Sequence, residues 1–206
     1  LSVSLPNVFY DMPNNDFSVS LWLKSDDISV DDAVVLMASL DNNNFVKIFS
    51  TGDQIHAATC IDGTQDAVRT ENLSSNEWYH IVVVWDASEE ERFIYCNGEI
   101  FTKVGDRTSL GSGSCLLEIG HGTSSSKFWK GYLDELEIYT RVLTQNQVYQ
   151  IYLTTKDGNY DKRVMISEVL NVGENWQCVV TPNDGVQDDI PVYSNIIQIK
   201  NYAGGD

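Results

Sequence analysis

Short stretches in which every second residue is apolar constrain the fold of this chain more than any other feature. In residues 17–24 (FSVSLWLK), the apolar alternate positions are Phe17, Val19, Leu21 and Leu23. Further short apolar stretches, separated by Asp, Asn and Gly, follow at residues 34–39, 45–49 and 55–61. A repeat of two is the repeat of a β strand, so the pattern predicts an antiparallel sandwich of short strands.

Two later segments strengthen this prediction. Residues 78–85 (WYHIVVVW) are apolar on both faces, which predicts a central strand that is covered on each side. Residues 92–96 and 99–104 flank Asn97-Gly98. Asn-Gly supplies the two positive φ angles of a type I′ turn, so these segments are predicted to form a hairpin.

The period changes from two to that of a helix only after Arg141. Val148, Ile151 and Tyr152 are at helical spacing, behind Thr144 as a candidate N-cap with Gln147 three residues on. We therefore predict one short helix after the strands at residues 115–119 and 132–139.

The charge excludes some partners. The 206 residues include 13 Lys and Arg against 30 Asp and Glu, which gives a net charge of −17. Such a chain repels a phosphate backbone, so nucleic acid and anionic membranes are not expected partners. No stretch approaches the roughly 18 apolar residues of a membrane span. Most of the acids are expected in solvated loops, where some of them are candidates for holding Ca²⁺.

The cysteines and one glycosylation sequon indicate the cellular compartment in which this protein is expected. Four cysteines are spaced too widely for a zinc site and lack nearby His: Cys60, Cys96, Cys115 and Cys178. We predict two disulfides in an oxidising compartment, with three pairings open. The sequon Asn72-Leu73-Ser74 makes Asn72 a candidate glycosylation site, which is compatible with an extracellular or cell-surface location.

Four motifs in order resemble one known family. They are FSVSLWLK, NEWYHIVVVWD, FIYCNGEI and GYLDELEIYTRVL, and they span about residues 1–153. Together they resemble the laminin G-like or concanavalin A-like jelly roll. The resemblance implies a two-sheet antiparallel sandwich; with the helix predicted above, the expected fold is an all-β jelly-roll sandwich with one short C-terminal helix. It also implies a module of secreted or surface proteins that binds carbohydrate or protein, commonly with a structural Ca²⁺.

Asp134 is the best candidate metal ligand. Alternation places it on one strand face with Tyr132, Leu136 and Ile138. A carboxylate among apolar neighbours needs hydrogen-bond donors or a cation. The family resemblance favours Ca²⁺; backbone N–H groups or a Ser hydroxyl are the alternative. The resemblance also implies a second ligand near the N-terminal strand, for which the candidates are Asp11 and Asp16.

Exposed aromatic rings are the candidate ligand-binding groups, because sugars and apolar anchors dock on them. Trp22, Trp78 and Trp85 lie within strong strands and are expected in the core. Trp129 follows a serine-rich loop and is the surface candidate. Its expected companions are Phe128, His121, Asn42, Asn43 and Asn44.

Catalysis is not expected. Retaining glycosidases need two carboxyl groups about 5 Å apart, and some that share this sandwich carry them on one strand. In this chain Tyr132 occupies the first of those positions, ahead of Asp134 and Glu137. Glu135 and Glu137 share a face in the alternation but are expected to be solvated.

The C-terminal part is expected to be separate. Residues 154–161 are a polar segment that predicts a linker, and LNVGENWQCVVTPNDG with SNIIQI resembles the last strands of immunoglobulin-like repeats of microbial surface proteins. Residues 162–206 are too short for the about seven strands of such a domain. They are a fragment, pack on the sandwich, or are completed by another chain.

These expectations support two functions. The first is a non-catalytic extracellular recognition or adhesion module that binds carbohydrate or a surface protein. The alternative is a structural subunit of a surface layer or filament, in which copies of the chain complete one another's C-terminal strands.

Overall fold

The computed structural model describes residues 2–3, 16–105, 116–122, 128–158, 170, 172–180 and 190–200. The chain divides into two compact units, Leu1–Tyr160 and Asp161–Asp206, which are described separately. Among the described residues, none of the helices has the length and apolar character needed to cross a bilayer.

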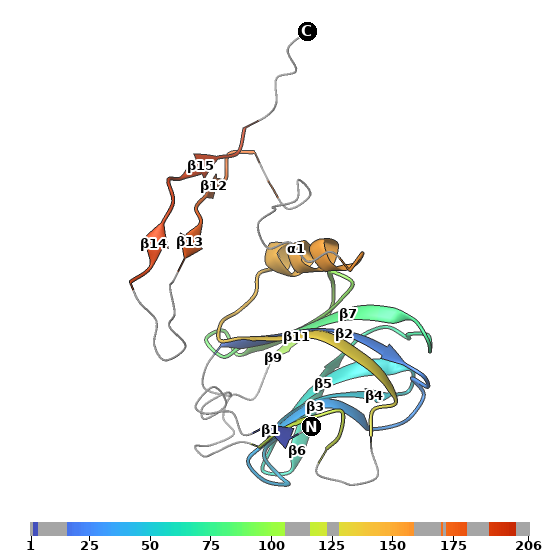
Figure 1. Ribbon diagram of the computed structural model, residues 1–206. Coiled ribbons are helices and arrows are strands. Elements are labelled where there is room, and N and C mark those ends of the chain that lie inside the picture. Colours follow the sequence, from blue (N-terminus) through green and yellow to red (C-terminus); the bar gives the residue numbers. More distant parts are fainter. Residues whose placement is uncertain are drawn as a thin grey trace. The chain divides into compact units, whose positions relative to one another are not determined.

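Unit 1 contains two antiparallel sheets (Figure 1). The six-stranded sheet has the order β1 (Ser2–Val3), β10 (Leu116–Ile119), β3 (Ala33–Ser39), β4 (Phe45–Thr51), β5 (Gln54–Ile61) and β6 (Thr64–Arg69). The five-stranded sheet has the order β11 (Gly131–Tyr139), β2 (Phe17–Ser25), β7 (Trp78–Asp86), β8 (Glu91–Cys96) and β9 (Glu99–Gly105). The predicted all-β jelly-roll sandwich is therefore confirmed.

The core between the sheets is built by the alternating apolar residues. Phe17, Val19, Leu21 and Leu23 all point inward from β2 and are buried. They pack with side chains from the other sheet, such as Leu36. Burial of this apolar surface is the main favourable contribution to folding.

β7 is the central strand of its sheet and is covered on both faces, as predicted. Its inward residues join the core, while Val82 and Val84 pack on the other side with Leu143 and Val148. That second layer is formed by α1 (Gln145–Thr155), which covers part of the outer face of the five-stranded sheet (Figure 1).

The ends of two elements follow local sequence chemistry. Thr144 caps α1 and forms the predicted capping box with Gln147. Asn97 and Gly98 have φ angles of 51° and 85° in the turn between β8 and β9, as a type I′ turn requires. A Cβ atom on Gly98 would also lie 2.7 Å from Cδ2 of Tyr149 on α1, so this turn accepts only glycine without rearrangement.

β11 contains a β-bulge that overturns one prediction. Leu133 pairs with Leu23 and Asp134 with Trp22, but the register then shifts before Glu137. Glu135, within the bulge, has a φ of 47°. Past the bulge, the inward positions are Leu136 and Ile138, which join the core. The prediction that Asp134 shares a face with these two apolar residues is therefore wrong, because one extra residue inverts the alternation; Asp134 is exposed.

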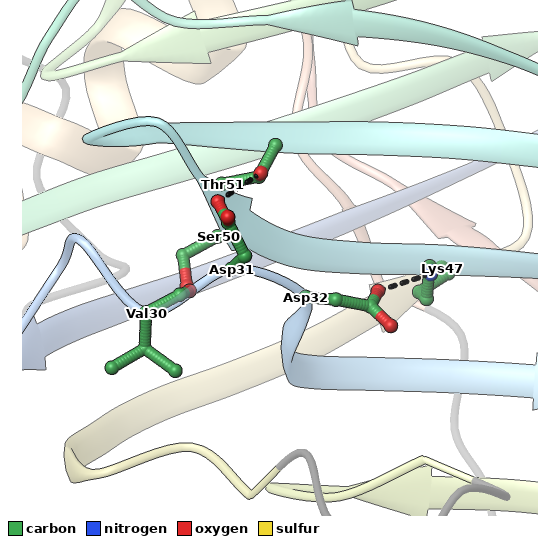
Figure 2. A network of polar contacts seen from close by, with 6 residues as sticks. All are labelled: Val30, Asp31, Asp32, Lys47, Ser50 and Thr51. Carbon is green, nitrogen blue, oxygen red and sulfur yellow. Dashed lines mark hydrogen bonds and ion pairs between the residues drawn. The ribbon is translucent and has the colours of Figure 1, made fainter.

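Two loop acids are held in place by hydrogen bonds. Figure 2 shows the connection between β2 and β3, where Asp31 accepts a hydrogen bond from the Thr51 hydroxyl at 2.5 Å. In the same loop Asp32 forms an ion pair with Lys47 at 2.5 Å. Lys47 is itself buried, so part of the chain's acidity attaches a loop to β4.

The three described cysteines are free thiols. Cys60 and Cys96 are buried in different apolar clusters, and Cys178 is exposed. Burial raises the pKa of Cys96 to about 12, so this thiol is inert as a nucleophile. Cys115 lies outside the described residues. The prediction of two disulfides is wrong in this structure, because three of the four cysteines are unpaired.

Unit 2 contains two small antiparallel pairs among its described residues. β12 (Asn175–Trp176) pairs with β15 (Ile197–Gln198), and β13 (Val179–Val180) pairs with β14 (Val192–Tyr193). The immunoglobulin-like assignment stays a prediction. In unit 1, α1 extends to Thr155, into the segment expected as a linker.

Candidate functional site

Two exposed rings lie side by side on the outer face of the five-stranded sheet. Tyr132 of β11 and Trp78 of β7 flank Lys24 of β2 in one row across three strands. Tyr132 is 62% exposed and Trp78 is 43% exposed, and their ring centroids lie 6.2 Å apart. We call Trp78 and Tyr132 the aromatic platform.

Trp22 lies in the next row, between Asp134 and His80. Its indole Nε1 donates a hydrogen bond to Oγ1 of Thr155 at 2.8 Å. The Thr155 hydroxyl in turn donates to the Ile151 carbonyl at 2.8 Å. These bonds fix the last turn of α1 against Trp22.

A pocket of about 240 Å³ opens between this end of α1 and the sheet. Its lining residues, which define the outer pocket, are Trp22, Trp78, Asp134, Glu135, Thr155, Lys156 and Gly158. The backbone N–H of Glu135 donates to Oδ1 of Asp134 at 2.8 Å and so orients that carboxylate. The outer pocket thus combines aromatic surface with a carboxylate acceptor and an ammonium donor.

A second cavity of about 240 Å³ lies beneath α1. The residues of this inner cavity are Ser20, Trp22, His80, Glu135, Leu136, Glu137 and Ile151. His80 is 1% exposed, and its Nε2 lies 2.9 Å from the Ser20 hydroxyl. Its Nδ1 is buried and has no hydrogen-bond partner among the described residues. Burial lowers the pKa of His80 to about 4, although Glu137 raises it in part, so the ring is neutral at pH 7.

A third cavity of about 230 Å³ lies between the sheets and is mostly apolar, with Leu21, Leu36 and Leu133 among its lining residues. Glu135 contributes to all three cavities. The bulge of β11 is therefore their common wall. Bulges and residues with unusual φ angles often mark functional sites, which makes this end of the sheet the candidate site.

Gly131 at the start of β11 allows the close approach of β11 to β2. Its φ is 140°, and a Cβ atom there would lie 2.0 Å from the Lys24 carbonyl oxygen. Glycine at this position therefore positions Tyr132 beside Lys24.

The aromatic residues predicted as the ligand-binding site lie elsewhere. Trp129 is half-buried against the core, and its Nε1 is buried without a partner among the described residues. Phe128 is 54% exposed, with its ring 6.2 Å from that of His121. His121 pairs with Glu118 at 3.2 Å.

The predicted asparagine loop is not next to these rings. Phe128 bridges to Val34 near the start of β3, whereas Asn42, Asn43 and Asn44 follow the end of that strand. Val34 lies five residues before Ser39, the end of β3, and at about 3.3 Å a residue this places the loop roughly 16 Å or more from Phe128. The predicted grouping is therefore not brought together.

The asparagine loop is also internally bonded. The backbone N–H of Asn43 donates to Oδ1 of Asp41 at 2.7 Å, and Nδ2 of Asn44 donates to the same oxygen at 3.1 Å. These bonds lower the pKa of Asp41.

The predicted calcium ligands do not meet. Asp16 precedes Phe17 at one end of β2, and Asp134 pairs with Trp22 near the other end. About six residues along a strand place them roughly 20 Å apart, so they cannot share an ion. Asp11 lies outside the described residues, and the described part of the chain contains no cluster of three His, Cys, Asp or Glu side chains suited to a metal. A structural Ca²⁺ stays a prediction that needs other ligands.

Two tryptophans of the site were expected in the core. Only Trp85 is buried there, stacked on Phe17 with centroids 4.3 Å apart. The sequence did carry a signal for Trp22, because it occupies a polar position in the alternation of residues 17–24. For Trp78 the signal was weaker: it is the first residue of its strand, where the cover of neighbouring elements ends.

Asn72 of the sequon is exposed, in the segment between β6 and β7. The neighbouring Leu73 is buried and its backbone N–H donates to the Asp53 carbonyl at 2.7 Å. Glycosylation at Asn72 stays a prediction.

Comparisons with known proteins agree with this fold. A family model described as the concanavalin A-like lectin/glucanases superfamily matches residues 2–149. A comparison with curated proteins gave no match.

Solved structures similar to the chain include three kinds of domain. Domain 4 of AbnA, an extracellular GH43 arabinanase from Geobacillus stearothermophilus, is 22% identical with a TM-score of 0.58, and the match covers 66% of this chain and 65% of that one. A SAP-like pentraxin from Limulus polyphemus is 16% identical with a TM-score of 0.55, covering 90% and 83%. The receptor binding domain of a botulinum neurotoxin C/D mosaic serotype is 16% identical with a TM-score of 0.59, covering 75% and 40%.

The chain spans 65% of the length of the arabinanase domain and 40% of that of the toxin domain. At these identities the likeness concerns the fold.

Proposed function

The chain belongs to the concanavalin A-like lectin/glucanases superfamily, and on this premise we propose that it is a non-catalytic carbohydrate-binding module. The observation that carries the proposal is the aromatic platform, two exposed rings 6.2 Å apart beside a pocket. Exposed Trp and Tyr rings offer flat apolar surface to the C–H face of a sugar and bury much area with little loss of side-chain entropy.

The groups around the platform suit hydroxyl recognition. Asp134 accepts hydrogen bonds, whereas Lys156 donates them, and both line the outer pocket. The pocket volume of about 240 Å³ lies below the roughly 300–1,000 Å³ typical of drug-sized ligands. It therefore suits a single sugar unit of a longer glycan whose neighbours lie on the platform.

The similar structures support this class of ligand. The arabinanase domain was solved in complex with arabinotriose. A botulinum neurotoxin binding domain was solved with rat synaptotagmin II, so the fold also presents surfaces to proteins. The arabinanase that contains the similar domain is extracellular, and this, together with the exposed sequon asparagine, supports an extracellular or cell-surface location for this chain.

The absence of catalysis is also part of the proposal. Tyr132 stands where the glycosidase motif has its first carboxylate, and its ring belongs to the platform. The Tyr139 hydroxyl donates a hydrogen bond to Glu137, which gives that carboxylate a structural partner. Hydrolysis of a polysaccharide that is lost on Glu137→Gln would contradict this part of the proposal.

A glycan array tests the binding. Trp78→Ala and Tyr132→Ala are expected to abolish recognition of the glycans that the wild-type protein binds. Phe128→Ala is the matched control, because it removes an exposed ring away from the site. Binding that survives both platform variants and is lost in the control would move the site to the Phe128 surface.

A second function rests on unit 2. Its described apolar side chains are largely exposed, including Val179, Ile190, Val192, Tyr193 and Ile197. Exposed apolar residues on short strands favour pairing with another polypeptide. The corresponding proposal is a structural subunit whose copies assemble through these strands. Sedimentation of the purified protein tests it: concentration-dependent oligomers that Ile197→Lys disperses support assembly, and a strict monomer at high concentration excludes it.

A further inference from the structure

The inner cavity beneath α1 has a polar wall that the fold itself does not require. Elsewhere this layer is apolar, with Val82, Val84 and Val148 packed together. In the inner cavity, the polar side chains of Ser20, His80 and Glu137 line the wall together with the apolar side chains of Leu136 and Ile151. A buried polar wall costs free energy unless its groups are hydrogen-bonded.

One atom in this wall has its hydrogen-bonding capacity unused. His80 is 1% exposed and lines the cavity, and its Nδ1 has no partner among the described residues. The other ring nitrogen faces Ser20 at 2.9 Å. A ligand atom within the cavity would supply the missing hydrogen bond to Nδ1.

The charge of the cavity selects the kind of ligand group. Glu135 and Glu137 both line it, and its described lining residues include no Lys or Arg. Ile151 lies in the last turns of α1, where the helix dipole is negative. Trp22 also lines the cavity, and an indole ring attracts a cation that lies over its face. Anions are therefore disfavoured there, and a small cation is favoured.

The inner cavity adjoins the candidate sugar site. Trp22 and Glu135 line both the outer pocket and the inner cavity. A sugar ring held at the outer pocket can therefore direct a substituent past Trp22 toward His80 and Glu137.

From this geometry we propose that the inner cavity is an ammonium subsite, so that the glycan bound by this protein carries a free primary amine, as glucosamine does. The inference rests on the proposed carbohydrate-binding function and specifies its ligand class. The ammonium group donates hydrogen bonds to Glu137, to Nδ1 of the neutral His80 and to the Ser20 hydroxyl. The acetylated amine of N-acetylglucosamine carries no positive charge and is bulkier. The hydroxyl that glucose has in the same place carries no positive charge either.

Calorimetric titration with three hexasaccharides of the same linkage tests the subsite. The probes are oligomers of glucosamine, N-acetylglucosamine and glucose. We expect the glucosamine oligomer to bind about tenfold tighter than the glucose oligomer at low salt, and this advantage to shrink as salt screens the charges. Equal affinity for the three oligomers, or preference for the acetylated one, would overturn the ammonium subsite.

Variants separate the subsite from the platform. Glu137→Gln is expected to remove most of the preference for the amine while binding of the glucose oligomer is retained. Glu99→Gln makes the same chemical change at an exposed position of β9 and is expected to keep the preference. If Glu137→Gln and Glu99→Gln retain the same preference, the subsite is not at Glu137 and the inference fails.

The failure of the proposed function has a different signature. If no oligosaccharide binds, or if Trp78→Ala binds all three as the wild type does, carbohydrate binding at the platform is excluded. If all three bind equally and Trp78→Ala abolishes binding, only the ammonium subsite is excluded.

Discussion

The two faces of the five-stranded sheet differ although they are made by the same strands. On the inner face, β2 presents Leu21 and Leu23, which are buried in a continuous apolar core. On the outer face the same strand presents Ser20, Trp22 and Lys24, which are partly covered by α1. The inner face contributes tightly packed apolar side chains to the core. The outer face has apolar cover only where the helix reaches, and beyond Thr155 it is free to bind.

The outer face itself also contains both structural residues and candidate binding residues. Val82 and Val84 lie beneath the middle of α1 and pack like a core. On the same strand, His80 lies two residues before Val82, beneath the end of the helix. Trp78 lies four residues before Val82, beyond that end. The position of one helix end therefore separates structural residues from candidate binding residues.

Truncation on the inner face is expected to have the largest effect on stability. Leu21 is 1% exposed and lies in the main core. Leu21→Ala should lower the free energy of unfolding by about 2–5 kcal/mol, because it removes buried apolar surface and leaves a cavity. Urea denaturation measures this. A loss below that of an outer-face variant would break the contrast between the faces.

The inner cavity should make stability depend on pH. The pKa of His80 is about 4 in the folded protein, below its ordinary value of 6.5, because burial disfavours the charged ring. The unfolded chain therefore takes up a proton first, so stability is full above pH 6.5 and falls as the pH drops from 6.5 toward 4. The loss attributable to His80 is about 3 kcal/mol at most.

Denaturation at several pH values in wild type and His80→Gln isolates this contribution. Glu135 and Glu137 face the same cavity in both proteins, and His56 and His121 are also common to both. Parallel pH profiles for the two proteins would show that His80 is not the titrating group.

The bond between α1 and Trp22 should contribute a smaller amount. Thr155→Val keeps the shape of the side chain but removes the hydroxyl that accepts from the Trp22 indole. We expect a loss of about 1 kcal/mol and a change in tryptophan fluorescence. Thr154→Val is the control, since the Thr154 hydroxyl donates to the Gln150 and Ile151 carbonyls within α1. Similar fluorescence changes in both variants would argue against the Trp22 bond.

The platform should matter least for stability. Trp78 is 43% exposed, so Trp78→Ala should change the free energy of unfolding by no more than about 0.5 kcal/mol while it abolishes glycan binding. Urea denaturation and the glycan array together check this. A large destabilisation would place Trp78 with the structural residues of the inner face.

Local patterns predicted much of the fold. The Asn97-Gly98 turn, the Thr144 capping box and the double-sided strand β7 were all recognisable, because each depends on residues close in the sequence. β6 was missed, since it is an edge strand and its sequence TQDAVR is mostly polar.

The site was predicted less well. The interpretation of Asp134 failed because alternation cannot show a bulge, which is set by pairing with β2. Trp129 was expected at the surface, yet it packs on the core, and Trp78 was expected in the core, yet it is exposed. Whether a ring is covered depends on elements far away in the sequence.

The sequence by itself determined the class of fold, an all-β sandwich with one capped helix, because strand period, turn chemistry and capping act over a few residues. Only the tertiary structure decided which side chains meet. It brought Trp22 of β2 to Thr155 of α1, and Tyr132 to Trp78 across β2. It also separated Asp16 from Asp134 along β2. Strand register and the place where a helix ends depend on long-range packing, and both lie beyond what local periodicity encodes.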